Sequence, residues 1–416
     1  MRALKIFKRY GLAKKQMQDC LLKYIKIMHN HNCVPTLPIT ACIVERYPTL
    51  IKRFLNEGVD FAIHGYIHID YTKLSAKILN EHLEKAIKIF RSLCIPFYGF
   101  RCPYLKLTEE ILENMSCFDF LWDSSQAVNW DLLKREDFSS EKWKNYQKMI
   151  AQYKPYNAQN RKILPKLKYN LVEIPVSLPD DDLLIDRLGI TNQKIIENIW
   201  SKILERTYHR GELFTLQLHP ERIKFCEKAL ESILMQAKKL NPGIWIASLS
   251  EIAKWWKEKK EFSFEIIDQG PNRYQIIARC SKRATILLKN SESNCSRKNF
   301  FDGYRITDGN MFFIESPAKP IVGIPVNSPI ELIDFLKEEG IPFEFNNDKN
   351  KYGVYLGNYS SFSDRNRREV FNAINQASSA LVRFWRWPHY ARSALAVTGD
   401  IDALTSIDFF LRFLKG

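Results

Sequence analysis

The sequence predicts an α/β protein whose main part is a parallel sheet surrounded by helices. Between about residues 1 and 258, short apolar runs alternate with longer stretches of helical periodicity. This alternation is the pattern of βαβ units. The chain of 416 residues is 45% hydrophobic and 13% aromatic, so it can form a large core. No run approaches the roughly 18 apolar residues that a membrane span needs.

The elements of this main part follow from local periodicity. Helices are expected where apolar residues recur every three or four positions, at 14–28, 49–56, 75–92, 107–115, 193–205 and 222–239. Strands are expected at the short apolar runs 33–44, 59–63, 98–100, 118–122, 172–176, 213–218 and 243–247. The polar stretch 131–168 shows neither pattern, and we expect a long loop beside the functional site.

The pattern changes near Lys260, which predicts additional domains. Residues 262–325 show β-type alternation and are expected to form a small β-rich domain. Residues 329–386 are expected to form a small α/β segment. An apolar strand at 393–397 and a helix at 405–414 end the chain, and we expect 387–416 to join 1–258 in one domain.

Cysteine usage and charge bound the compartment and the partners. Nine scattered cysteines, an odd number without a CxxC pair, predict free thiols in a reducing compartment. Residues 1–30 contain no secretory signal, so we expect a cytoplasmic protein. The net charge of +15 predicts an acidic partner or a solvated basic surface. No nucleic-acid-binding motif is present, which leaves an anionic glycan, glycolipid or membrane surface.

Two carboxylates follow the last apolar strand, in the segment Thr398-Gly399-Asp400-Ile401-Asp402. In an extended chain, residues i and i+2 share a face. Asp400 and Asp402 are therefore expected to emerge together at the carboxyl end of a strand, where the sites of βα barrels lie. Asp-x-Asp pairs are also common in solvated turns and helix caps, so this pair alone decides nothing.

Histidines follow two other predicted strands. His64 and His68, in His-Gly-Tyr-Ile-His, are four positions apart and can bind one metal ion if the segment makes a helical turn. His219 ends the segment Leu-Gln-Leu-His-Pro at 216–220. Either pattern can arise by chance. Taken together, these segments indicate a functional site, because each follows a strand-like run.

Three further segments complete the set. Arg101 and Tyr104 belong to Arg-Cys-Pro-Tyr, which follows the strand at 98–100 and could also be a simple turn. Trp-Asp-Ser-Ser at 122–125 follows the next strand and is either part of a site or the turn that ends the strand. Acidic residues follow at Glu173 and in the run 180–182.

Together these segments resemble the motifs of the polysaccharide deacetylases, carbohydrate esterase family 4. That family carries an Asp-Asp, a His-x-x-x-His, an Arg-x-Pro-Tyr, an acidic or tryptophan, and a Leu-x-Leu-His motif. The second, third and fifth match here in the family's order, and 243–256 resembles the family's closing segment. The resemblance covers about 14–258 and 385–416. It implies a distorted (β/α) barrel, with the β-rich domain and the small α/β segment as additions.

One departure from the family is large. The Asp-Asp motif normally comes first in the chain, and here it comes last, at 398–402. We interpret this as a circular permutation in which the strand 393–398 inserts beside the strand before Val44. Two alternatives stay open. The strand could complete a neighbouring chain by domain swapping, or the last 30 residues could be the start of a second deacetylase unit.

The resemblance implies a divalent metal held by Asp402, His64 and His68, with an open position for water. Two histidines and one carboxylate are typical of catalytic zinc, our expected metal, and also suit iron, cobalt or manganese. Asp400 would be the general base, and its charge would be held by Arg101.

The remaining roles implied by the resemblance belong to the leaving group and the oxyanion. His219 would be the general acid, and the backbone N–H of Tyr104 would bind the oxyanion. The acid that supports the last histidine in the family has three candidates here, Glu173, Asp180 and Asp182.

The implied activity is N-deacetylation of the N-acetylated sugars of a polysaccharide. Deacetylation or deformylation of a polyprenyl-linked sugar at an anionic membrane surface is an alternative, because it would explain the basic charge. A glycan-binding pseudoenzyme is another alternative, although an intact set of two aspartates, three histidines and an arginine argues against it. Trp385 and Trp387 are expected to pack in an interface or to stack on sugar rings.

Overall fold

The computed structural model describes residues 6–411, except 8, 292, 294, 358 and 360. The chain divides into two compact units. The first contains the residues up to Leu240, Ile246–Lys254 and the residues from Ala394 onward, and the second contains Asn241–Trp245 and Trp255–Ser393. Among the described residues, no helix is both long and apolar enough to cross a bilayer.

A single mixed sheet forms the centre of the first unit. Its strands follow the order β6-β5-β9-β10-β22-β1-β2-β3-β4-β8-β7, and β11 (Ile244–Ile246) also pairs with β22. Along the ordered path β7 and β8 are antiparallel, and the other pairs are parallel. The strands are β1 (Thr36–Ile39), β2 (Asp60–Ile63), β3 (Gly99–Phe100), β4 (Trp122–Asp123), β5 (Ala127–Asn129), β6 (Tyr156–Asn157), β7 (Lys166–Lys168), β8 (Leu171–Glu173), β9 (Val176–Leu178), β10 (Leu213–Leu218) and β22 (Ser393–Gly399).

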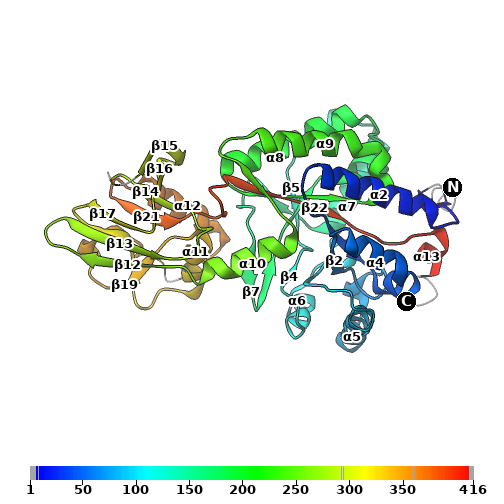
Figure 1. The fold of residues 1–416 in the computed structure, drawn as a ribbon, viewed down its shortest axis with the longest axis horizontal. Coiled ribbons are helices and arrows are strands. Elements are labelled where there is room, and N and C mark those ends of the chain that lie inside the picture. The colour runs from blue at the N-terminus through cyan, green and yellow to red at the C-terminus, as the bar shows by residue number, and fades with distance from the viewer. Residues whose placement is uncertain are drawn as a thin grey trace. The chain divides into compact units, whose positions relative to one another are not determined.

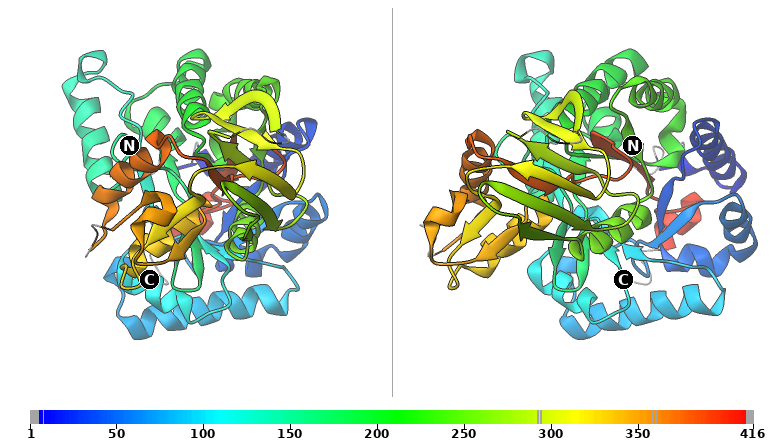
Figure 2. Two further views of the ribbon diagram at one scale, coloured as in Figure 1. Left: turned by 90° about the vertical axis from the view of Figure 1, so that its left-hand side faces the viewer. Right: turned by 60° about the vertical axis from the view of Figure 1, so that its left-hand side comes forward.

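Helices surround this sheet, as the blue, cyan and green coils show (Figures 1 and 2). Helix α5 is an example of an apolar stripe that is buried: Leu79, Leu83 and Phe90 face inward. The hydroxyl of Ser75 caps its first turn. The helices are α2 (Lys15–Asn30), α3 (Ala41–Arg46), α4 (Pro48–Asn56), α5 (Ala76–Ser92), α6 (Glu109–Ser116), α7 (Ser140–Tyr153), α8 (Gln193–Arg210), α9 (Ile223–Lys239), α10 (Leu249–Lys260) and α13 (Ser406–Leu411). The predicted α/β class is confirmed.

Strand β22, drawn in red, lies in the middle of the sheet (Figure 1). It pairs in parallel with β10, from Leu213 opposite Ala394 to Leu218 opposite Gly399, and with β1 at Thr36 opposite Thr398. All seven of its residues are buried, as a continuous apolar run in a parallel sheet requires. In this structure the strand therefore pairs within its own chain, beside β1 as expected.

Three expectations about local structure are wrong. The stretch 33–44 is not extended throughout, because helix α3 begins at Ala41, directly after β1. The stretch 131–168 is not an irregular loop: it contains α7, whose first turn is capped by the Ser139 hydroxyl. The run 172–176 forms two strands, β8 and β9, which pair with different neighbours. The end of the helix expected at 405–414 lies outside the described residues.

The second unit is built from three small sheets and two helices. The sheets have the orders β12-β13-β17, β15-β16-β14-β21 and β19-β18-β20. The elements are β12 (Ser263–Asp268), β13 (Arg273–Arg279), β14 (Ile286–Lys289), β15 (Cys295–Phe301), β16 (Tyr304–Thr307), β17 (Met311–Glu315), β18 (Lys319–Ile324), α11 (Ile330–Glu339), β19 (Phe343–Phe345), β20 (Tyr352–Tyr355), α12 (Asp364–Gln376) and β21 (Leu381–Phe384).

The predicted β-rich and α/β stretches share one compact unit. Strand β21 comes from the stretch 329–386, yet it pairs with β14 from the stretch 262–325, with Ile286 opposite Phe384. Trp385 and Trp387 are fully buried, and the indole N–H of Trp385 donates to the carbonyl of Ala391. Of the two alternatives for these tryptophans, internal packing is confirmed, and stacking on a sugar ring is wrong because neither ring is accessible.

Candidate active site

Four of the five consecutive strands β10-β22-β1-β2-β3 are each followed by a predicted site residue. Strand β2 leads to His64, β3 to Arg101, β10 to His219 and β22 to Asp400. Because these five strands are parallel, their carboxyl ends lie at the same edge of the sheet.

The main chain after β22 is fixed on both sides. The N–H of Asp400 donates to the Leu218 carbonyl at 3.0 Å, and the N–H of Ile401 donates to the Pro38 carbonyl at 2.8 Å. Gly399 leaves room for this approach, since a Cβ there would lie 2.8 Å from Cδ2 of Leu37. The two carboxylates that follow are therefore held by backbone contacts to both flanking strands.

His64, His68 and Asp402 form a cluster of possible metal ligands. Their ligand atoms lie within 4.8 Å of one another. Oδ1 of Asp402 lies 3.5 Å from Nε2 of His64 and 3.3 Å from Nε2 of His68. All three side chains have little exposure, at 2%, 6% and 11%.

The hydrogen bonds around this cluster suit a cation. Nδ1 of His64 faces the carbonyl oxygen of Arg101 at 2.8 Å, and a carbonyl only accepts, so Nδ1 carries the proton. Nε2 of His64 then presents a lone pair toward Asp402, whose buried Oδ1 has no hydrogen-bond partner in the described part of the chain. Two acceptors that face each other require a positive charge between them, and this donor set fits a divalent metal.

The segment between the two histidines is a tight turn. Gly65 adopts φ of +81°, and a Cβ there would lie 2.5 Å from the hydroxyl oxygen of Tyr71. That hydroxyl accepts the N–H of Tyr66 at 2.8 Å, in a fully buried contact. The turn brings His68 back toward His64, so that their ring centroids are 5.1 Å apart.

Asp400 is held at both of its oxygens. Nη1 of Arg101 donates to Oδ1 at 2.7 Å, and Nε2 of Gln217 donates to Oδ2 at 2.8 Å. Arg101 is fully buried and also donates to the hydroxyl of Thr398 at 2.8 Å. These two donors hold the carboxylate in place.

The loop 101–105 is fastened by the residues of the Asp-Ser-Ser segment. Arg101 donates to the carbonyl and the hydroxyl of Ser124, at 2.7 and 2.8 Å. The hydroxyl of Ser125 accepts the N–H of Cys102 at 2.8 Å and donates to Asp123 at 2.6 Å. Burial raises the pKa of Asp123 to about 6, against the effect of these hydrogen bonds.

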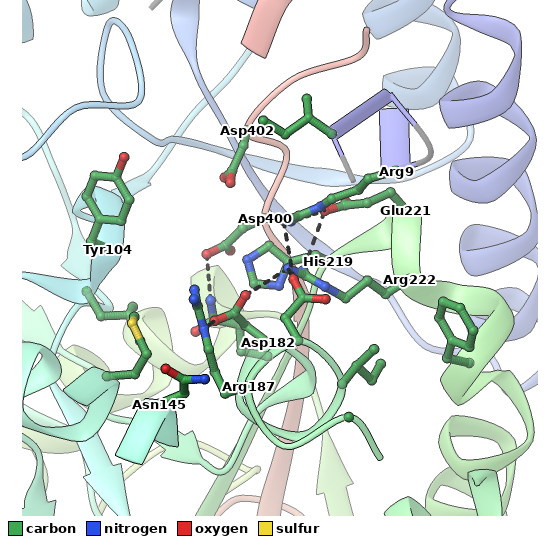
Figure 3. Close-up of a pocket in the computed structure, with 18 of the residues that line it drawn as sticks. Arg9, Tyr104, Asn145, Asp182, Arg187, His219, Glu221, Arg222, Asp400 and Asp402 are labelled. Carbon is green, nitrogen blue, oxygen red and sulfur yellow. Dashed lines mark hydrogen bonds and ion pairs between the residues drawn. The ribbon is translucent and has the colours of Figure 1, made fainter. Parts of the chain in front are cut away.

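Tyr104 lies opposite the two aspartates across the site (Figure 3). It adopts φ of +61°, and Leu105 follows with φ of +53°. This left-handed conformation is costly for residues other than glycine, and it is retained where the surroundings enforce it. The ring of Tyr104 meets the ring of His68 edge to face, with centroids 4.4 Å apart.

His219 is paired with Asp181, which corrects the sequence prediction. Nδ1 of His219 donates to Oδ1 of Asp181 at 2.7 Å, and the N–H of His219 donates to Oδ2 at 2.7 Å. Burial lowers the pKa of His219, but the Asp181 carboxylate outweighs burial and the pKa rises to about 10.

None of the three predicted candidates takes the place of Asp181. Asp180 accepts the N–H of Leu183, and Asp182 forms ion pairs with Arg187 and Arg222. Glu173 belongs to β8, which is separated from β10 in the sheet order. The acidic run was the correct region, but its main-chain path, which the sequence does not give, decides which carboxylate faces the histidine.

These residues line a cavity of about 910 Å³. Six of the seven predicted site residues lie on its wall, while Arg101 is buried behind it. Helix α7 contributes Lys142, Asn145 and Met149, so the missed helix forms part of the wall. Figure 3 shows Asp400, Asp402 and His219 at one end, with the charged cluster Arg9, Glu221 and Arg222 beside them.

Comparison with known proteins agrees with this geometry. Residues 16–120, which contain His64, His68, Arg101 and Tyr104, match the family model described as polysaccharide deacetylase. This chain carries a polysaccharide deacetylase domain. The Asp-Asp segment at 398–402 lies outside the matched residues of that domain.

The deacetylase domain also has curated and solved relatives. A peptidoglycan deacetylase-like protein of Gibberella zeae is 23% identical over 280 residues, which are 62% of this chain and 75% of that protein. A protein from Mycobacterium smegmatis, assigned as a polysaccharide deacetylase, is 20% identical with a TM-score of 0.44, over 57% of this chain and 76% of its own. The PuuE allantoinase is 17% identical with a TM-score of 0.45, over 57% and 72%. The two structural likenesses are too low to bear on the activity.

Proposed function

We propose that the deacetylase domain removes acetyl groups from the N-acetylated sugars of a polysaccharide in a metal-dependent reaction. One observation carries this proposal: the His64, His68 and Asp402 cluster lies beside a paired carboxylate, Asp400, and a paired imidazole, His219, on the wall of one cavity. Hydrolysis of an amide needs an electrophilic centre, a base for water and an acid for the leaving amine.

The metal would be held by Nε2 of His64, Nε2 of His68 and a carboxylate oxygen of Asp402. When bound, a divalent cation such as Zn²⁺ polarises the acyl carbonyl and lowers the pKa of water. The proton on Nδ1 of His64 is already committed to the carbonyl of Arg101, which leaves Nε2 as the ligand atom.

Asp400 is proposed as the general base. Arg101 and Gln217 bind one oxygen each, and every carboxylate oxygen has a second lone pair that can take a proton from water. The guanidinium of Arg101 is buried and holds the carboxylate in place through its hydrogen bond.

His219 is proposed as the general acid, and Tyr104 as an oxyanion donor. The raised pKa of His219, about 10, keeps its imidazole protonated at neutral pH, as a donor to a leaving amine must be. The water oxygen joins the acyl carbon, the C–N bond breaks, and the nitrogen takes the proton of His219. The products are acetate and a free amine on the sugar. The backbone N–H of Tyr104 would stabilise the negative oxygen that forms in between.

The test is the stoichiometry of the products. The zinc-loaded protein is incubated with N-acetylated chito-oligosaccharides, and acetate and new primary amine are measured. Equal amounts of both are expected, and His219→Ala is expected to lower kcat about 100-fold or more. A metal-loaded wild-type protein that releases neither product contradicts the proposal.

We further propose that the motif order of the domain is circularly permuted. Support comes from the position of β22 between β10 and β1, and from the family match, which begins only at residue 16. The segments near both ends also meet: the N–H of Ser406 donates to the carbonyl of Gly11 at 2.8 Å.

A rearranged chain tests the permutation. Moving residues from Ser393 onward in front of residue 6, through a short Gly/Ser linker, restores the motif order of the family. The rearranged protein is expected to fold and to bind metal as the original does. Loss of folding for several linker lengths would argue that the original order is required.

A further inference from the structure

Gln217 lies next to the proposed base and has no role in the motif set described above. It is the middle residue of Leu216-Gln217-Leu218, on strand β10, and only 3% of it is exposed. Residues two apart on a strand share a face, so Gln217 points to the same side as His219. The side chain reaches the wall of the cavity.

The amide of Gln217 is oriented by Asp400. Its Nε2 lies 2.8 Å from Oδ2 of Asp400, in a fully buried contact. A carboxylate only accepts hydrogen bonds, so the nitrogen, not the oxygen, must face it. In this orientation the buried Oε1 of Gln217 has no hydrogen-bond partner among the residues that the structure describes.

An amide with one buried, unpaired oxygen is a poor choice for stability, because an unsatisfied buried acceptor keeps its desolvation penalty. An apolar side chain of similar length would remove that penalty, but it would leave the buried Oδ2 of Asp400 without its donor. What the amide adds is a donor to Asp400. Arg101 binds only Oδ1, and the terminal torsion of an aspartate is broad, so a single donor leaves the carboxylate plane free to turn. A second donor on Oδ2 fixes that plane.

We propose that Gln217 is a positioning residue, which holds Asp400 in the orientation needed to take a proton from water. This inference rests on the proposed function. It differs from a structural role in one respect: removing the amide should lower kcat and leave KM almost unchanged.

Gln217→Met is the test variant, because methionine keeps the length of the side chain and lacks both polar atoms. We expect kcat on N-acetylated chito-oligosaccharides to fall on the order of 100-fold, as expected for a displaced catalytic group. KM should stay close to the wild-type value, and a Tm measurement should show that the variant is folded at the assay temperature. Gln217→Glu keeps the shape but places an acceptor against Asp400, and it should lose at least as much kcat.

Thr215→Val is the matched control. Thr215 lies on the same face of β10, is fully buried, and its hydroxyl has no hydrogen-bond partner in the described residues. The Thr215 hydroxyl therefore makes no hydrogen bond to Asp400. Its removal should leave Tm equal or higher, and it should leave kcat unchanged.

Two results overturn the inference: a Gln217→Met protein whose kcat stays within about threefold of wild type, or a folded one whose KM rises as much as its kcat falls. The rate of the wild-type protein distinguishes failure of this inference from failure of the proposed function. An active wild type with an active Gln217→Met variant refutes the inference alone. A wild type that carries metal but releases no acetate refutes the proposed function and this inference with it.

Discussion

The pairing of His219 with Asp181 predicts where the alkaline limb of the pH–rate profile lies, and which substitution moves it. Asp181→Asn keeps the size of the side chain and an oxygen that can accept from Nδ1 of His219. It removes the negative charge 2.7 Å from the ring. Burial, which lowers the pKa of His219, remains, and so does the positive charge of Arg222.

The magnitude follows from these opposing effects. In the wild type the pKa of His219 is raised from 6.5 to about 10. Without the carboxylate, burial and Arg222 lower the pKa and only the smaller effect of Glu221 raises it, so the pKa should be 6.5 or lower. At pH 8 the protonated fraction then drops from about 99% to at most about 3%. If His219 is the general acid, kcat/KM at pH 8 falls at least about 30-fold, equivalent to about 2 kcal/mol.

The assay is the pH dependence of kcat/KM for acetate release between pH 5.5 and 10, which reports the free enzyme. The displacement between the two proteins is the prediction, because a bound cation would shift both profiles alike. Asp182→Asn serves as the control, since Asp182 pairs with Arg187 and Arg222 rather than with His219. Coincident alkaline limbs for wild type and Asp181→Asn would refute the reasoning, as would an equal loss at every pH.

Three further changes test other parts of the structure. Tyr71→Phe removes the hydroxyl that accepts the buried N–H of Tyr66, so a loss of about 10- to 100-fold in Zn²⁺ affinity is expected by titration; unchanged affinity would show that this bond does not position the histidines. Gly99→Ala places a Cβ 2.0 Å from the buried ring of Trp122. Chemical denaturation should show that the free energy of unfolding falls by about 1–3 kcal/mol or more. Gly243→Ala is the control and should change it very little, because nothing lies within 4 Å of the added Cβ. Burial lowers the pKa of Lys259 from 10.5 to about 7, so the native state binds fewer protons than the unfolded state between these values. Relative to Lys259→Met, wild-type stability should therefore rise by up to about 1.4 kcal/mol per pH unit in that window, and parallel stability curves for the two proteins would contradict this.

Periodicity and strand-end motifs predicted the elements that position the site. An apolar run such as 213–218 has few alternatives to a buried strand, and a polar residue directly after it must lie at the sheet edge. This is why the sequence alone predicts that His64, Arg101, His219 and Asp400 lie together. The position of β22 beside β1 was predicted differently, from the family resemblance, which places the strand 393–398 beside the strand before Val44.

The features that were missed depend on tertiary context. Helix α7 is mostly exposed, so its composition resembles a loop, and its Ser139 cap is a weak signal alone. Asp181 could not be separated from its two acidic neighbours, because the turn that aims it at His219 has no sequence signature. Gln217 belongs to the Leu-Gln-Leu-His motif, but a strand pattern does not reveal that its amide binds Asp400 at the end of the neighbouring strand β22.

The most direct test of the account is a comparison of metal content and acetate release for three proteins: wild type, Asp402→Ala and Asp400→Asn. The wild-type protein is expected to bind about one metal ion per chain. Asp402→Ala should lose metal and acetate release together, whereas Asp400→Asn should keep the metal and lose acetate release. If both variants keep both properties, the segment after β22 supplies neither the ligand nor the base, and the central claim is wrong.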